Sequence, residues 1–258
     1  MKLATWNVNS IRAREARLIR WLQNHQPDAL CLQELKVDTE SFPFDAVRRV
    51  GYEAAVYGQK TYNGVAILSR VTPRNVQRGM AGYDDEQARL VGADVGEVRV
   101  ISAYFPNGQA VGTEAYEYKL EWMGRLREHL EATASPDAPL IIAGDFNVAP
   151  RDSDTPNPLL WGGSVLCHEF ARDALRRIGE WGLVDVFEKH YPEGGEYTWW
   201  DYQSRAFEKN IGLRIDHIYA TEPLAARSTS VRVDREERAE SELGKPSDHA
   251  PVIAEFDL

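Results

Sequence analysis

Residues 140–147 constrain the fold of this chain more than any other stretch. Their sequence, Leu-Ile-Ile-Ala-Gly-Asp-Phe-Asn, starts with a short apolar run that ends at a glycine, which is typical of a buried strand. Because alternate residues of an extended segment point to the same side, Asp145 and Asn147 can reach one site. A carboxylate beside a neutral amide suits a reaction that moves protons and handles phosphate oxygens.

The same arrangement recurs along the chain. Other strand-like runs, near residues 3–7, 29–34, 98–104, 213–216 and 251–256, carry polar side chains at their ends or flanks. These side chains are Asn7, Glu34, Tyr104, Asp216, Asp248 and His249. A single polar strand end means little, because every strand must stop. Several with compatible chemistry favour a shared functional site.

The order of apolar patterns predicts a mixed α/β fold. We expect helices at 11–25, 113–133 and 168–179, and a hairpin of 90–95 with 98–104 around Gly96 and Glu97. Further strands are expected at 53–57, 64–68, 197–200, 215–220, 228–233 and 252–256. Hairpins among helices argue against a purely parallel, doubly wound sheet. Two mixed sheets packed face to face with helices outside fit better, and without any linker-like segment we expect one domain over residues 1–258.

Composition restricts the class of protein. The chain starts directly with a strand-like run rather than a signal peptide, and no run approaches the roughly 18 apolar residues of a membrane span. Only Cys31 and Cys167 are present, without a Cys-X-X-Cys motif or a Cys/His cluster, which argues against a zinc site and disulfides. We therefore expect a soluble protein of the reducing cytoplasm.

The charge of the chain is acidic overall. The formal net charge is −10, which lowers the expectation of tight nonspecific binding to nucleic acid, although 30 Lys and Arg residues are available for one face. Three local basic clusters are candidates for such a face, with an ordinary solvated surface as the alternative for each. They are Arg12/Arg14/Arg17/Arg20, Arg70/Arg74/Arg78 and Arg205/Lys209/Arg214.

Seven short motifs follow one another along the chain: TWNVNSIR at 5–12, LQELK at 32–36, GVAI at 64–67, YFPNG at 104–108, GDFN at 144–147, GLRIDH at 212–217 and SDHAP at 247–251. Taken in order, they resemble the motifs of the exonuclease III family, which contains bacterial exodeoxyribonuclease III and apurinic/apyrimidinic endonucleases. The resemblance runs from residue 2 to the C-terminus. It implies the four-layer α/β sandwich of deoxyribonuclease I and Mg²⁺-dependent cleavage of DNA phosphodiesters, with Mn²⁺ as the alternative ion.

The resemblance also implies which side chains hold the metal. Glu34 is the expected ligand, because Mg²⁺ prefers carboxylate oxygens and water. Asn7 is expected to add an oxygen to the metal or to hold the phosphate. Asp248 is expected to bind the metal directly or through water, or to support His249.

The remaining polar residues receive catalytic roles from the resemblance. His249 and Asp216 form a histidine–carboxylate pair that donates to a phosphate oxygen or shuttles a proton. Asp145 is expected to orient and activate water or to protonate the leaving oxygen. Asn147 would hold the phosphate or the nucleophile, and Tyr104 would donate to a phosphate oxygen through its hydroxyl. His217, next to Asp216, is expected to point to the opposite face of its strand.

The resemblance places DNA contacts at Asn107 and in a small apolar pocket. One of the adjacent Trp199 and Trp200 is expected in the core, and the other, by family alignment Trp199, would wall the pocket together with Leu213 and Ile215. A base-less deoxyribose fits such a slot, and flipping it out is cheap because it has lost its stacking. Both tryptophans in the core is the alternative.

The sequence thus predicts a DNA-repair phosphodiesterase that acts on duplex DNA. We expect a monomer that nicks 5′ to abasic sites and has 3′-to-5′ exonuclease and 3′-phosphatase or 3′-phosphodiesterase activity. The alternatives are a general nuclease of the deoxyribonuclease I type, a sphingomyelinase or inositol-phosphate phosphatase, and a DNA-binding module without catalysis. A serine hydrolase is excluded for want of a nucleophile-elbow motif.

Overall fold

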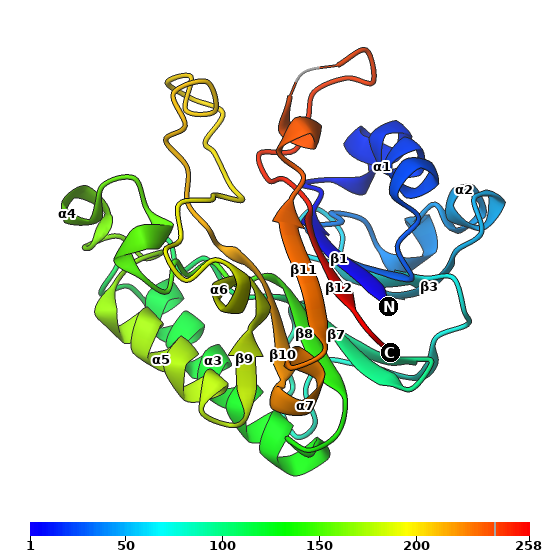
Figure 1. The fold of residues 1–258 in the computed structure, drawn as a ribbon, viewed down its shortest axis with the longest axis horizontal. Coiled ribbons are helices and arrows are strands. Elements are labelled where there is room, and N and C mark those ends of the chain that lie inside the picture. The colour runs from blue at the N-terminus through cyan, green and yellow to red at the C-terminus, as the bar shows by residue number, and fades with distance from the viewer. Residues whose placement is uncertain (240) are drawn as a thin grey trace.

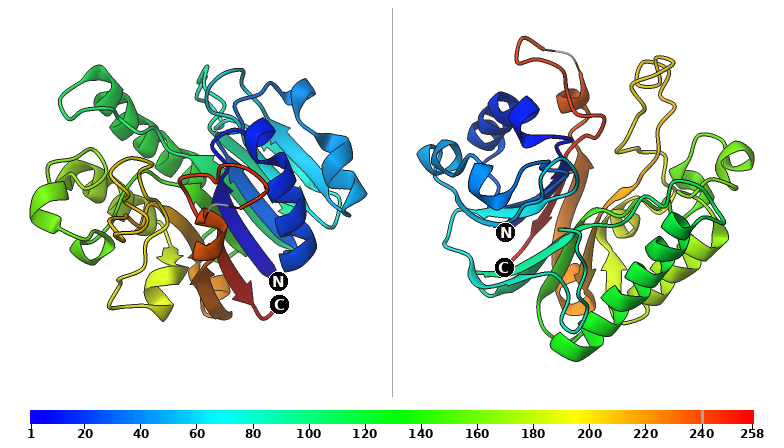
Figure 2. Two further views of the ribbon diagram at one scale, coloured as in Figure 1. Left: turned by 90° about the horizontal axis from the view of Figure 1, so that it is seen from above. Right: turned by 180° about the vertical axis from the view of Figure 1, so that it is seen from behind.

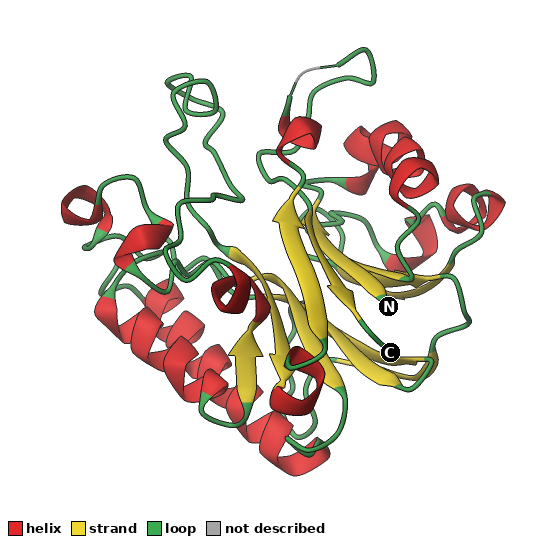
Figure 3. Cartoon of the chain, viewed as in Figure 1, coloured by secondary structure: helices red, strands yellow, loops and turns green. Residues whose placement is uncertain are grey.

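Two six-stranded β-sheets pack face to face at the centre of the molecule, and helices cover their outer faces (Figures 1 and 3). The computed structural model describes residues 1–239 and 241–258. The expected α/β sandwich of two mixed sheets is confirmed. Figure 2 shows α1 and α2 on one outer face and α3 and α5 on the other, with both chain ends side by side.

The first sheet has the strand order β11-β12-β1-β2-β4-β3. Only β1 and β2 pair in parallel, and the other neighbours are antiparallel. The strands are β1 Lys2–Asn7, β2 Ala29–Gln33, β3 Glu53–Tyr57, β4 Val65–Ser69, β11 Ser228–Val233 and β12 Val252–Phe256.

The second sheet has the order β5-β6-β7-β8-β10-β9, with β7 and β8 in parallel and the rest antiparallel. The strands are β5 Arg74–Arg78, β6 Leu90–Val95, β7 Val98–Tyr104, β8 Leu140–Asp145, β9 Leu183–Asp185 and β10 Asp216–Thr221. The Gly96 hairpin forms as expected. Gly144 is required by close packing, since a Cβ there would overlap the carbonyl oxygen of Ala103 on β7.

The helices and helical turns lie between and outside the strands. The α-helices are α1 Ile11–His25, α2 Phe44–Arg49, α3 Glu114–Thr133, α4 Pro158–Trp161, α5 Glu169–Gly179, α6 Val186–His190 and α7 Glu222–Ala225. The 3₁₀ turns are η1 Thr39–Ser41, η2 Asp152–Asp154 and η3 Arg235–Arg238. In the part of the chain so described, no helix is both long and apolar enough to cross a membrane.

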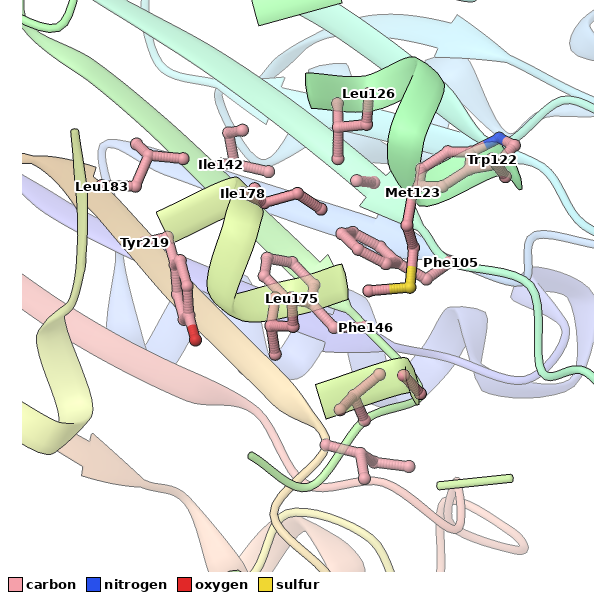
Figure 4. Packing of buried hydrophobic residues seen from close by; sticks show 14 of the residues in the cluster. Phe105, Trp122, Met123, Leu126, Ile142, Phe146, Leu175, Ile178, Leu183 and Tyr219 are labelled. Atoms are coloured by element: carbon pink, nitrogen blue, oxygen red, sulfur yellow. The ribbon is translucent and has the colours of Figure 1, made fainter. Parts of the chain in front are cut away.

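Alternation along the strands builds separate layers of core. On β8, Ile141 faces the opposite sheet while Ile142 packs beneath the outer helices. Figure 4 shows this outer layer, in which Ile142 belongs to the same buried cluster as Leu126 of α3 and Ile178 of α5. On the other side, Trp6 and Leu32 pack under α1 and α2. The inner faces of both sheets are therefore mainly apolar, and the polar strand ends are left at the rim.

One predicted strand is wrong. Residues 197–200 form only isolated bridges, from Trp199 to Leu213 and to His249. The N–H groups of Thr198 and Trp199 both donate to the carbonyl of Leu213, while Trp200 N–H donates to that of Asp248. Since these partners belong to the approaches to two different sheets, no continuous ladder can form. The segment joins the sheets at their shared edge instead.

Candidate active site

The strand register brings the predicted polar residues to one edge of both sheets. Asn7 ends β1, and its register partner Gln33 ends β2 directly before Glu34. Tyr104 and Asp145 are register partners at the ends of β7 and β8. Asp216 begins the antiparallel β10 opposite Asp145, and His249 precedes β12, whose Val252 pairs with Thr5. The edge lies at the upper end of the strands in Figure 1.

Three side chains are joined directly at this edge. The Asn7 Nδ2 group donates to Glu34 Oε1 at 2.8 Å and to Asp145 Oδ2 at 2.9 Å. The Asn7 Oδ1 atom accepts from the Asn9 N–H at 3.0 Å, so the amide nitrogen faces the carboxylates. Glu34 has a backbone φ of +52°, a left-handed conformation that non-glycine residues adopt mainly where the surroundings enforce it. Asn7 thus ties together two acids contributed by opposite sheets.

His249 and Asp216 form the predicted pair. Asp216 Oδ2 lies 2.9 Å and Oδ1 3.1 Å from His249 Nδ1, and His249 Nε2 lies 3.8 Å from Asp145 Oδ2. All three side chains are almost fully buried. Burial opposes protonation of the ring, but the Asp216 and Asp145 carboxylates raise the pKa of His249 to about 10. The ring is therefore an imidazolium with its Nε2–H directed to the Asp145 side of the site.

For Asp145, burial and the neighbouring acids both favour the neutral, protonated form. Burial raises its pKa to about 7, and the Asp216 and Glu34 charges add to this, while His249 and the Asn7 amide act against it. The Asn147 N–H also donates to Asp145 Oδ1 at 2.9 Å. A carboxylate poised near neutrality suits a group that accepts and returns a proton.

Tyr104, Asn147 and Asn107 form one side of the edge. Burial and the Glu34 and Asp145 charges raise the pKa of Tyr104 well above 10, so its hydroxyl keeps its proton. Asn107 Nδ2 donates to Asn147 Oδ1 at 3.0 Å, and Asn147 Nδ2 donates to the Phe105 carbonyl at 3.0 Å. The two asparagines expected to contact the phosphate or the DNA are therefore linked to each other next to Asp145, and Tyr104 lies on the Glu34 side.

Asp248 lies beside this group rather than inside it. Its Oδ1 accepts from Asn9 Nδ2 at 2.8 Å and its Oδ2 from Trp199 Nε1 at 3.1 Å. Although burial acts against it, the His249 charge and these two hydrogen bonds lower the pKa of Asp248. Lys36 Nζ contacts Asn9 Oδ1 at 2.5 Å and Glu34 Oε2 at 2.9 Å, which adds a cation at the rim.

The aromatic and apolar candidates lie on the other side of His249. Trp199 is half-buried and meets the ring of Trp161 edge-on at 6.4 Å, whereas Trp200 is buried in a small separate core. The structure thus separates the two tryptophans in the predicted sense. Leu213 and Ile215 are buried behind Trp199 and belong to the core under α3 and α5.

The donor set fits a hard divalent cation. One ligand atom from each of Glu34, Asp145 and His249 lies within 4.8 Å of the other two. Burial lowers the pKa of His249, but the neighbouring carboxylates outweigh it and raise the pKa to about 10. The ring is therefore protonated at neutral pH and is a poor metal ligand. The two carboxylates supply the oxygens that Mg²⁺ prefers, and Glu34, the more exposed, opens the position to water.

Several basic residues expected near DNA are buried instead. Arg14 donates to the carbonyls of Asn9 and Pro246, and Arg17 pairs with Glu237 at 2.9 Å. Arg214 is fully buried between Asp154 and Asp185. These three arginines fix loops around the site, so the predicted clusters that contain them are wrong as exposed basic faces. The surrounding members Arg12, Arg205 and Lys209 are exposed.

Two buried hydroxyl groups that support the site were not predicted from the sequence. The Thr198 Oγ1 atom accepts from the N–H groups of Ile215 and Asp216 at 3.1 and 3.0 Å, and Ser247 Oγ donates to the Asn7 carbonyl at 2.7 Å. Ser247 lies inside a recognised motif and Thr198 lies outside all seven, and a buried hydroxyl that serves the backbone has no periodicity to reveal it. His217 points away from Asp216, as predicted, and contacts Arg214 and the Val148 carbonyl.

Comparisons with known proteins agree with this geometry. The model of the endonuclease/exonuclease/phosphatase family matches residues 4–249. Exodeoxyribonuclease III of Haemophilus influenzae is 35% identical, with 99% of this chain and 100% of that protein covered. The solved structure of an AP endonuclease from Archaeoglobus fulgidus superposes with a TM-score of 0.96 at 41% identity, and that of a 3′-5′ exonuclease from Neisseria meningitidis with 0.95 at 42%, both over 100% of each chain. The chain therefore belongs to the endonuclease/exonuclease/phosphatase family and, within it, to the exonuclease III family.

Proposed function

We propose that the protein is a DNA-repair phosphodiesterase that acts on duplex DNA at abasic sites and 3′ ends with the help of Mg²⁺, or of Mn²⁺ as the alternative ion. The observation that carries this is the convergence of Glu34, Asp145 and the His249–Asp216 pair at one edge, in a chain of the exonuclease III family. The activities named for its relatives, endonuclease and exonuclease, are assigned to one site here.

One bond accounts for all the proposed activities. Incision 5′ to an abasic site, release of a 3′ nucleotide and removal of a 3′ phosphate each break the bond between phosphorus and a 3′ oxygen and leave a 3′ hydroxyl. Water supplies the new oxygen on phosphorus. One of its protons passes to a base and from there to the departing 3′ oxygen, and the other stays with the new phosphate oxygen and is lost to solvent. A single set of proton donors and acceptors therefore suffices.

Asp145 is the proposed proton acceptor. Its carboxylate is fixed by Asn7 Nδ2 and the Asn147 N–H at 2.9 Å each, and burial raises its pKa to about 7. In its ionised form it orients and deprotonates the attacking water, and the proton can return to the leaving 3′ oxygen.

His249 is the proposed stabiliser of the phosphate charge. Asp216 fixes the ring through Nδ1 and leaves the Nε2–H free for a nonbridging phosphate oxygen. Asn147 and Tyr104 would donate to other phosphate oxygens, and Asn107 would contact the DNA while it fixes the Asn147 amide.

The cation would be held mainly by Glu34 together with an oxygen of Asp145. When bound, it would act as a Lewis acid that offsets charge on the phosphate. Asn7 is proposed to support the cation site by fixing both carboxylates, and Asp248 to contribute through water. Lys36, now 2.9 Å from Glu34 Oε2, would be released to face the phosphate.

Trp199, with Leu213 and Ile215 behind it, is the proposed wall of a pocket for a base-less sugar. Trp199 is half-buried and anchored to Asp248 through its Nε1–H, so it presents a fixed face beside His249. An intact nucleotide would be excluded by size, and flipping is least costly where stacking is already lost. We further propose that the chain acts as one domain and as a monomer.

Cleavage of defined duplex oligonucleotides tests the proposal. One substrate carries a tetrahydrofuran abasic analogue, one a recessed 3′ end and one a 3′ phosphate, each assayed with Mg²⁺, with Mn²⁺ and with EDTA. We expect products that end in a 3′ hydroxyl with either ion and none in EDTA. Lack of cleavage with both ions would contradict the proposal. Equal cutting throughout an intact duplex would indicate a general nuclease instead.

A further inference from the structure

Lys119 is a buried cation without a carboxylate partner among the described residues. It lies in the second turn of α3 and is fully buried, and burial lowers the pKa of its amine to about 7 although the Asp145 charge opposes this. Taking an ammonium group out of water is expensive unless hydrogen bonds replace the lost solvent. The burial of the Lys119 ammonium group therefore needs an explanation beyond packing.

The Lys119 ammonium group donates to three main-chain carbonyls from three separate segments. The acceptors are Asn147 at 2.7 Å, Val165 at 2.7 Å and Asn107 at 3.2 Å. Asn147 follows β8, Asn107 follows β7, and Val165 precedes α5. One amine thus ties the ends of two neighbouring strands to the segment before α5.

Two of these carbonyls belong to residues of the proposed site. Asn147, held in a left-handed conformation at φ +50°, donates its N–H to Asp145 Oδ1 at 2.9 Å. Its side chain accepts from Asn107 Nδ2 at 3.0 Å. The Lys119 amine is therefore one peptide unit away from the hydrogen bond that orients the proposed base.

The loop after β7 is shaped to admit this lysine. Gly108 has a φ of +91°, and a Cβ there would lie 3.0 Å from Lys119 Cδ and 3.1 Å from Tyr116 Cδ2. A side chain at that position would press on the lysine stem. The close approach of loop and helix brings the Asn107 carbonyl within reach of the amine.

We propose that Lys119 is a positioning residue, whose ammonium group clamps the carbonyls of Asn107 and Asn147 and thereby fixes Asp145 and the two asparagines for attack on the phosphate. The inference rests on the proposed function of the site. A role in stability alone would leave turnover per folded molecule unchanged.

The test compares Lys119→Met and Lys119→Arg with a matched control, Lys189→Met. Lys189 also donates to main-chain carbonyls, of Ala225 at 2.6 Å and Ala226 at 3.3 Å, but it lies on α6 away from the site. Single-turnover cleavage of the tetrahydrofuran duplex is measured at saturating enzyme, together with DNA affinity, at a temperature where circular dichroism shows each variant folded. We expect Lys119→Met to lose about 100-fold in the cleavage rate with little change in affinity. Lys119→Arg should recover most of it, and Lys189→Met should cleave at the wild-type rate.

A wild-type cleavage rate in folded Lys119→Met would overturn the proposal, as would an equal loss in Lys189→Met. If Lys119→Met does not fold, Lys119→Gln, which keeps two N–H donors, replaces it with an expected loss of about tenfold, and an unchanged rate overturns the proposal in the same way. A second readout does not depend on activity. The side-chain amide NMR signals of Asn107 and Asn147 should shift in the Lys119 variants and not in Lys189→Met, even if the wild type cleaves none of these substrates.

Discussion

Asp216 and His217 are neighbours on β10, yet they belong to two different buried histidine–carboxylate clusters. Asp216 faces the proposed catalytic cluster, which also contains Glu34, Asp145 and His249. His217 faces the arginine cluster, which also contains Asp154, Asp185 and Arg214. The two clusters use the same kinds of side chain and lie on opposite faces of one strand.

The clusters differ in their balance of charge. In the arginine cluster, Arg214 lies 2.7 Å from both Asp154 and Asp185, and although burial acts against it, Arg214 lowers the pKa of Asp185. In the catalytic cluster only Glu34 has a lysine, Lys36 at the rim, while Asp145 and Asp216 share one imidazolium and burial raises the pKa of Asp145 to about 7. A buried cluster in which each carboxylate contacts a guanidinium directly suits a structural role. A buried carboxylate without such a contact, like Asp145, has capacity left for a cation or a proton.

The largest expected effect separates the clusters by activity. Asp145→Asn should lower the single-turnover cleavage rate by about 10³-fold or more, because it removes the proton acceptor, and should leave DNA affinity nearly unchanged. The free energy of unfolding should not fall, since an acid whose charged form is disfavoured has been removed. A loss below tenfold would move the proton-transfer role to another residue.

The second effect separates them by stability. Arg214→Met leaves Asp154 and Asp185 buried without their cation, so the free energy of unfolding should fall by about 3–5 kcal/mol, as for other broken buried ion pairs. Urea unfolding at neutral pH measures this. A change within about 1 kcal/mol would show that the arginine cluster does not carry the structural role assigned to it.

A third test uses the pH dependence of stability in EDTA. Burial raises the pKa of Asp145 to about 7, so the stability linked to its proton is complete below its usual value of 3.8 and is lost as pH rises through about 7. Burial opposes protonation of His249, but the neighbouring carboxylates raise its pKa to about 10. The contribution of His249 to stability is therefore complete below pH 6.5 and is lost as pH rises through about 10. Asp185 acts in the opposite sense, because its pKa is lowered: its contribution is present above 3.8 and is lost on acidification.

Urea midpoints at several pH values should therefore fall between pH 4 and 10 for the wild type, apart from the acid limb due to Asp185. The slope between pH 4 and 7 should be smaller in Asp145→Asn. If both variants, Asp145→Asn and Arg214→Met, kept the wild-type profile, the contrast between the clusters would not be electrostatic.

The smallest expected effect tests whether Trp199, next to the catalytic cluster, contacts the substrate. Trp199→Ala should lower cleavage at the abasic analogue about tenfold more than exonuclease action, because the loss of an apolar contact in a small pocket is worth about 1–3 kcal/mol. Trp200→Ala is the matched control. It empties a buried position and should reduce stability without a preference between substrates. Equal losses on both substrates in Trp199→Ala would favour a packing role for Trp199.

The polar residues at the strand ends were predictable because the alternation of side chains along a strand can be followed in the sequence. Asp145 follows an apolar run whose alternation fixes its direction, and the same rule placed His217 on the opposite face. The edge strand β5 was missed because its exposed, polar residues carry no such pattern, and β9 because it is only three residues long. Residues 197–200 look like a strand, but their partners lie on two sheets.

Long-range partners could not be predicted. Nothing local distinguishes Arg214, which is buried between two aspartates, from the exposed Arg205 and Lys209 of the same expected cluster. Lys119 likewise occupies a helix position that would suit a solvated lysine, and its acceptors lie in three distant segments. The roles of these cations follow from tertiary contacts, which no periodicity encodes.

The segment at 197–200 has a wider consequence, because Trp199 bridges Leu213, which leads into one sheet, and His249, which leads into the other. Glu34 and His249 lie next to strands of the first sheet, and Asp145 and Asp216 lie at strand ends of the second. The distances from Glu34 and His249 to Asp145 and Asp216 therefore depend on the spacing between the two sheets, which are the two halves of the sandwich. Turnover in this enzyme will respond to the filling between the halves, for instance at Val100 or Ile141, well away from any bound DNA.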